Sequence, residues 1–142
     1  MNLSTHALVG MTVGRLSKKP LLALVFGATS HAILDCLPHL DSWDPLLRVI
    51  DGTCTVAALT WAQSSPKPEL EIAGAIGALL PDVENIPGYG AVTEPKKLFP
   101  SHWFRHETRS ARCGIAVELL VLMTALAILS WPYPNRTRQI VP

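Results

Sequence analysis

One segment near the end of the chain, residues 114–131, constrains most strongly how this chain can fold. It reads GIAVELLVLMTALAILSW, and its one charged residue is Glu118. As a helix, such a run is just long enough to cross a hydrocarbon layer of about 30 Å. A glutamate inside a span is a candidate functional residue, unless it forms a salt bridge within the bundle, for instance with Arg48. The segment therefore predicts a membrane helix.

The composition of the whole chain agrees with a membrane location. Apolar residues make up 49% of the 142 residues and charged residues 16%, whereas roughly 25% of an average soluble domain is charged. This length suits one domain, so we expect a single helical domain over residues 1–131 and a disordered tail over 132–142. The net charge is +1 with scattered Lys and Arg, which offers no basic stripe and excludes nucleic acid as a partner.

Helical periodicity predicts an all-α bundle of about five helices. Apolar residues recur at helical spacing in four earlier stretches: 4–16, 21–37, 45–62 and 68–80. Ser4 or Thr5 can cap the first, and Asp44 followed by Pro45 can begin the third. A fifth helical segment begins at Ser101, a good N-cap. Small residues on the second and fourth stretches, such as Gly27 and Gly74, allow close helix packing.

The cysteines and the N-terminus suggest the compartment. Cys36, Cys54 and Cys113 are an odd number at wide spacing, which fits neither a disulfide framework nor a zinc finger. We therefore expect buried, reduced thiols. No basic region precedes an apolar core at the N-terminus, so the sequence predicts no cleavable signal peptide.

A polar cluster follows the apolar second helix. His31 and Asp35 are four residues apart, so their Cβ atoms lie about 5–6 Å apart on one helical face, and one metal ion can be held by both. Pro38 stops the helix, after which His39 and Asp41 can turn back toward the same point. The alternative is a hydrogen-bonded pair at a solvated helix end.

Two further polar groups stand in similar places. Asp82 directly follows the apolar fourth helix and Pro81. His102 and His106 are four apart in the fifth segment, where two charged imidazoles would repel each other and a shared cation would relieve the repulsion. The alternative is that this pair lies on a polar surface. Antiparallel packing can gather such helix ends, so we expect Asp35, Asp82 and His102 at one end of the bundle.

Together these motifs resemble the membrane-bound metal-dependent hydrolase family, which is similar to zinc-dependent phospholipase C and nuclease proteins. The resemblance rests on Thr5-His6, SHxxLDxxPHxD at 30–41, GALLPD at 77–82 and SHW…H at 101–106. It implies a polar metal centre, with Asp41 next to it, formed by His6, His31, Asp35, His39, Asp82, His102 and His106. Family members often carry Asp and then His after the LPD motif, where this chain has Glu84 and Asn85.

Mixed imidazole and carboxylate ligands suit Zn²⁺, with Mn²⁺ or Fe²⁺ as alternatives. We expect hydrolysis of a phosphoester or phospholipid-type substrate at a membrane, with Asp82 or Asp41 as general base and metal-activated water as nucleophile. Two other interpretations stay open: a membrane module that binds metal without turnover, and a structural bundle in which the polar groups pair with one another. The oligomeric state is left open.

Overall fold

The computed structural model describes residues 1–39, 44–85 and 111–133. These residues form five α-helices and one short 3-10 helix, and they include no strand. The elements are α1 (Leu3–Leu16), α2 (Pro20–Asp35), α3 (Pro45–Ala62), α4 (Pro68–Leu79), the 3-10 helix η1 (Leu80–Asn85) and α5 (Ala111–Ser130). The prediction of an all-α bundle of about five helices is confirmed.

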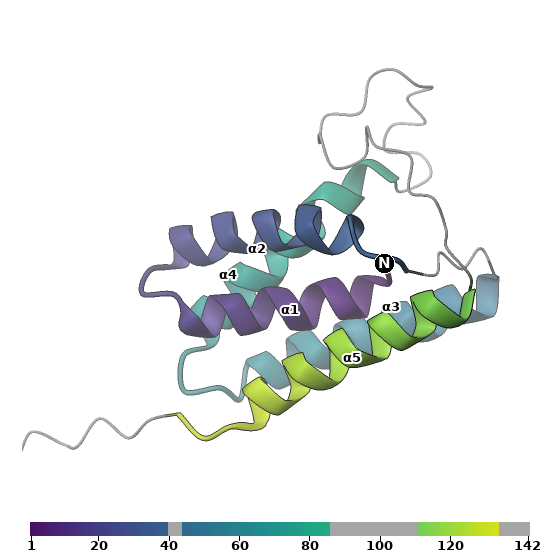
Figure 1. Ribbon diagram of the computed structural model, residues 1–142. Coiled ribbons are helices and arrows are strands. Elements are labelled where there is room, and N and C mark those ends of the chain that lie inside the picture. The colour runs from purple at the N-terminus through teal and green to yellow at the C-terminus, as the bar shows by residue number, and fades with distance from the viewer. Residues whose placement is uncertain (40–43, 86–110, 134–142) are drawn as a thin grey trace, which may run out of the picture.

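Helix α1 is the centre of the fold. It contacts each of the other four α-helices, while α2 and α4 also pack on each other. In Figure 1, α1 runs between α2 above it and α5 below it. The side chain of Met11 in α1 is fully buried, and it belongs to an apolar core that α1 shares with α3, α4 and α5, formed by Leu8, Met11, Ala58, Ala62, Ala75, Ala125 and Leu129.

Glycines allow α1, α2 and α4 to approach closely. A Cβ atom added to Gly27 of α2 would collide with the carbonyl oxygen of Gly74 in α4, and one added to Gly74 would collide with the carbonyl oxygen of Gly10 in α1. Backbone carbonyls cannot move aside as flexible side chains can, so these positions have room for hydrogen only. The small faces predicted on the second and fourth helices are confirmed as packing surfaces.

The start of α1 differs from the prediction. Ser4 or Thr5 was expected to cap it, but the helix begins at Leu3 and both residues lie inside its first turn. The cap comes instead from α3, where Asp51 accepts hydrogen bonds from the backbone N–H groups of Leu3 (2.8 Å) and Ser4 (3.0 Å). A carboxylate at this place satisfies free N–H donors and suits the positive end of the helix dipole.

The start of α3 agrees with the sequence prediction, whereas the end of α2 and the exposure of the cysteines differ from it. Asp44 caps α3 as predicted, accepting from the backbone N–H of Leu46 at 2.9 Å. The second helix was predicted to reach Leu37 but ends at Asp35. The cysteines were expected to be buried, but all three thiols are free and exposed.

Polar contacts hold α5 against the bundle at two places. In its third turn, the buried Glu118 accepts hydrogen bonds from the backbone N–H of Asn2 and the hydroxyl of Thr5, both at 3.1 Å. Glu118 therefore holds the beginning of α1, in place of the salt bridge to Arg48 considered from the sequence. At the C-terminal end of α5, the guanidinium of Arg15 donates to the carbonyl of Leu129 at 2.6 Å.

Candidate metal centre

The polar residues meet where α1 begins and α2 ends. His6 lies at the end of the first turn of α1, and His31 and Asp35 lie on one face of the last turns of α2. Asp82 lies in η1, which follows α4, the helix that packs against both α1 and α2. The rings of His6 and His31 are almost completely buried, with 1% and 0% of their surface exposed.

Asp35 joins the two histidines. Its Oδ2 atom lies 2.9 Å from Nε2 of His31, and its Oδ1 atom lies 3.2 Å from Nε2 of His6. The amino group of Met1 is 3.6 Å from the same Oδ1 atom. One carboxylate therefore fixes the orientation of two imidazole rings, as carboxylates do for metal-binding histidines in many proteins.

The other side of the His31 ring faces α4 and η1. Its Nδ1 atom lies 2.8 Å from the carbonyl oxygen of Ala78 and 3.8 Å from Oδ2 of Asp82. A carbonyl oxygen only accepts hydrogen bonds, so His31 donates from Nδ1. The rings of His6 and His31 stack with their centroids 4.1 Å apart.

The surroundings of His31 favour its charged form. Burial acts to lower its pKa, but the hydrogen bond to Asp35 and the negative charge of Asp82 outweigh burial, so the pKa of His31 is raised. For Asp35, burial acts to raise the pKa, but hydrogen bonds from His31 and His6 hold that pKa well below its usual range. Both shifts favour a charged imidazole beside a charged carboxylate in the metal-free protein.

The surroundings of His6 favour its neutral form. Burial lowers the pKa of His6 more than its hydrogen bond to Asp35 raises it, so the ring is neutral at pH 7. Its Nε2 atom then donates to Asp35, which leaves a lone pair on Nδ1. This Nδ1 atom is buried and has no hydrogen-bond partner among the described residues. A buried polar atom without a partner calls for an explanation, and a missing ion is one of the standard ones.

A metal ion fits the space between His6, His31 and Asp82. One ligand atom from each of these three residues lies within 4.8 Å of the other two. Ligand atoms that bind one tetrahedral zinc at about 2.0–2.1 Å are about 3.4 Å apart. To bind one such ion, the three ligand atoms would have to move closer together by up to about 1.4 Å.

The structure brings together His6, His31, Asp35 and Asp82 of the seven predicted metal ligands. His39 is buried, but its Nδ1 donates to the carbonyl of Leu37 at 2.7 Å, and it is not in the three-residue group. Asp41, His102 and His106 lie outside the described residues.

Two features of the site were not predicted from the sequence. One is the carbonyl oxygen of Ala78, which accepts from His31 and has no signal in the sequence, because every residue has a carbonyl. The other is the pair of carboxylates that bind the first turn of α1, Asp51 and Glu118, which are ordinary acidic residues on distant helices.

Comparison with protein-family models, with curated proteins and with solved structures finds no match to this chain. The functional conclusion therefore rests on the chemistry of the centre.

Proposed function

We propose that this protein is a membrane-embedded metal-dependent hydrolase that acts on a phosphoester of lipid type. The observation that carries the proposal is that two buried imidazoles and a partly exposed carboxylate lie together, with Nδ1 of His6 left free to bind a cation. A nitrogen and oxygen ligand set favours Zn²⁺, and Mn²⁺ or Fe²⁺ are the alternatives. A cation there supplies hydrolytic chemistry because it lowers the pKa of a coordinated water.

Each residue of the centre has a distinct task in this proposal. Asp35 orients both rings through their Nε2 atoms and balances the charge of the site. His31 has to release the Nδ1 proton that it donates to Ala78 before this nitrogen can bind a metal, so metal binding weakens as the pH falls. The side chain of Asp82 is 21% exposed. Asp82 is the most exposed of the three residues, and we assign it the role of general base.

The membrane part of the proposal is supported by the helix surfaces. Large apolar side chains are exposed on α2, α3 and α5, among them Leu21, Leu47 and Leu120. Water-soluble monomers rarely expose large apolar patches, so the number of such side chains on these helices supports contact with lipid. Residues Arg112–Ser130 are long and apolar enough to cross a membrane, and only 22% of that window is buried. A core helix of a soluble protein would be mostly buried, so lipid is the natural environment for α5.

One observation favours a second candidate function. Without any metal, Asp35 already accepts hydrogen bonds from both histidines, and His31 also donates to Ala78. Such a cluster can serve as a structural centre that fixes the relative positions of α1, α2 and α4. In that case the protein binds no metal and hydrolyses nothing.

Metal content and turnover separate these candidates. We would purify the protein in detergent without a polyhistidine tag and measure bound metal by elemental analysis. We expect about one equivalent in the wild type and strong loss in His6→Gln and Asp82→Asn. Glu71→Gln is the matched control, since Glu71 is a buried carboxylate that contacts Arg15 rather than the centre.

The hydrolase assignment needs a second measurement on the same samples. The metal-loaded wild type should hydrolyse bis(p-nitrophenyl) phosphate, and His6→Gln and Asp82→Asn should lose this activity together with the metal, while Glu71→Gln should keep both. Bound metal without turnover would leave a metal-binding module, and absence of metal from the wild type would leave the structural centre.

A further inference from the structure

We infer that Glu118 of α5 is a positioning residue of the candidate metal centre, because it fixes the first turn of α1, which carries His6. The inference rests on the proposed function for the metal ion and adds its regulation: the seating of α5 on α1 sets how tightly the centre binds metal. Among the described residues, Glu118 is not in the group that could hold the ion. Its effect on the metal therefore passes through α1.

A short chain of hydrogen bonds connects Glu118 with the backbone of His6. A single oxygen atom of Glu118, Oε1, accepts from the backbone N–H of Asn2 and from the hydroxyl of Thr5, both at 3.1 Å. The carbonyl oxygen of Asn2 accepts in turn from the backbone N–H of His6 at 3.1 Å. The first N–H groups of a helix have no partner within the helix, so the position of this turn depends on acceptors outside α1.

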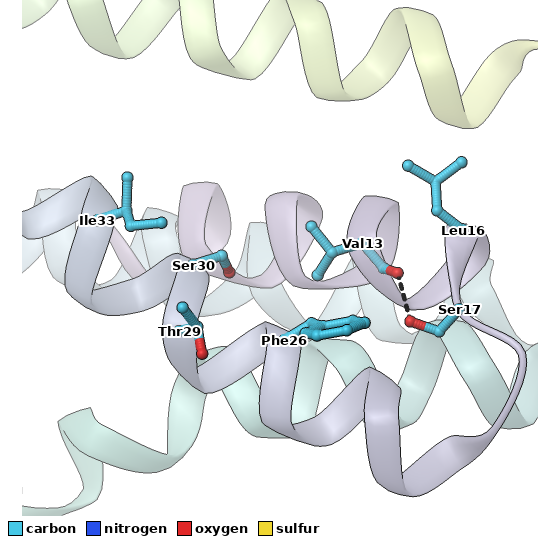
Figure 2. A pocket seen from close by; sticks show the side chains of 7 residues that line it. All are labelled: Val13, Leu16, Ser17, Phe26, Thr29, Ser30 and Ile33. Atoms are coloured by element: carbon cyan, nitrogen blue, oxygen red, sulfur yellow. Dashed lines mark hydrogen bonds between the residues drawn. The ribbon is translucent and has the colours of Figure 1, made fainter.

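Thr5 differs from the other buried hydroxyl residues of this segment. Thr12 donates to the carbonyl of Leu8 at 2.8 Å, and Ser17, which directly follows α1, donates to that of Val13 at 2.8 Å (Figure 2). Both bonds close on a carbonyl four residues earlier. The hydroxyl of Thr5 instead crosses to α5, and Thr5 directly precedes His6. This contact therefore couples α5 to the neighbour of a candidate metal ligand.

Burial makes the contact costly to break. The exposed fractions of Glu118, Thr5 and His6 are 9%, 2% and 1%. A carboxylate taken out of water is costly unless it is paired. The first turn of α1 offers Glu118 hydrogen-bond donors and the positive end of a helix dipole, and a movement of α5 along α1 would forfeit both. The positions of α5 and of this turn are therefore fixed together.

The ring of His6 is held from α2. Its Nε2 atom lies 3.2 Å from Oδ1 of Asp35, so Asp35 holds the ring while Glu118 holds the backbone that carries it. Asp51 also binds the first turn, but at the first two residues of the helix. A ligand side chain has to stay within about 0.5 Å of its productive position. Loss of the Glu118 contact therefore weakens metal binding even though no ligand is removed.

Zinc affinity measures the effect on the metal. The full-length protein in detergent would compete for Zn²⁺ with a chromogenic chelator. Glu118→Ala removes the acceptor, and we expect the affinity to fall about 10–100-fold, as for other residues that support metal ligands. Glu118→Gln keeps one oxygen, and one oxygen accepts both bonds, so its affinity should stay close to that of the wild type. Thr12→Val is the matched control, since it removes a buried hydroxyl of α1 that bonds within its own helix.

The position of the His6 ring can be read without metal. Protein with isotope-labelled histidines, treated with chelator, gives NMR signals of the ring nitrogens, and His6→Gln identifies those of His6. We expect Glu118→Ala to shift the His6 signals, whereas Glu118→Gln and Thr12→Val should leave them as in the wild type. Thr5→Val removes one of the two bonds and leaves Glu118 in place, and it repeats both measurements if Glu118→Ala does not fold.

In a wild type that binds zinc, the inference is overturned when Glu118→Ala leaves either the affinity or the His6 signals unchanged. It is also overturned if Glu118→Gln or Thr12→Val causes the same loss, because the effect is then general damage to the bundle. A wild type that binds no zinc removes the proposed function. The His6 signals then decide alone: a shift in Glu118→Ala supports the positioning of His6, and no shift overturns it.

Discussion

His6 and His31 stack their imidazole rings with centroids 4.1 Å apart and planes 22° from parallel, although they belong to different helices. Both Nε2 atoms point to the carboxylate of Asp35. Two adjacent rings cannot both carry a charge at low cost, and the environment resolves this by raising the pKa of His31 and lowering that of His6. Asp35 is therefore the residue on which the metal-free centre depends.

Replacing Asp35 tests this dependence. Asp35→Ala leaves a buried, charged His31 without its carboxylate, so we expect a loss of about 3–5 kcal/mol in the free energy of unfolding of the metal-free protein. Denaturant titration in detergent with a chelator measures it. Glu69→Ala changes an exposed carboxylate of α4 and should stay within about 0.5 kcal/mol. Equal effects of the two substitutions would contradict the central role of Asp35.

Metal removal should lower the stability of the wild type. A ligand that binds only the folded state adds about 2.7 kcal/mol when it is present at 100 times its dissociation constant. We expect a chelator to reduce the melting temperature of the wild type and Zn²⁺ to restore it. His31→Ala should lose about 1–3 kcal/mol through the partners left unpaired, and its melting temperature should not respond to chelator. If the melting temperature of the wild type also does not respond to chelator, the result argues for the structural centre.

The pH dependence of stability can report the charge on His31. Since its pKa is raised in the folded protein, its contribution is fully present below the unfolded value of 6.5 and is lost as the pH rises through the folded pKa. The difference in unfolding free energy between wild type and His31→Gln, both with chelator, should therefore shrink from pH 6 toward higher pH. A difference that is constant with pH would mean that His31 is neutral in the folded state.

Glycine substitutions should separate packing from helix propensity. Gly27→Ala places a methyl group against the backbone of α4, and we expect a cost of about 1–3 kcal/mol from overpacking. Gly52→Ala in α3 meets nothing within 4 Å and should gain about 0.5–1 kcal/mol in helix stability. Thermal unfolding compares the two, and a gain at position 27 would show that α2 and α4 are farther apart than described.

The membrane proposal predicts where charge is tolerated. The exposed Leu120 lies in the middle of α5, and an arginine at the centre of a span costs about 2.5–3.5 kcal/mol of insertion free energy. We expect the wild type to resist carbonate extraction and Leu120→Arg to be partly extracted. Ser64→Arg, in the loop between α3 and α4, should behave like the wild type. Recovery of the wild type as a detergent-free monomer would refute membrane insertion.

The sequence by itself determined the helices. Periodic apolar residues, the Asp44-Pro45 start of α3 and the small residues of α2 and α4 are local signals. They predicted the helices, the cap of α3 and the close packing of α2 on α4, although α2 ends at Asp35 instead of Leu37. It also predicted that His31 and Asp35 face the same way, since four residues along a helix return to one face. The motif resemblance picked out His6 and Asp82 as residues of the same centre.

Only the tertiary structure decided how these residues act. Whether Asp35 binds a metal or orients two histidines depends on His6, which reaches it from another helix. Asp51 caps α1 from α3, and Glu118 turns toward α1. The raised pKa of His31 and the lowered pKa of His6 depend on burial and on neighbours distant in sequence. These are properties of contacts between helices, whose free energies depend on distance and solvent exclusion, and no local pattern of residues encodes either.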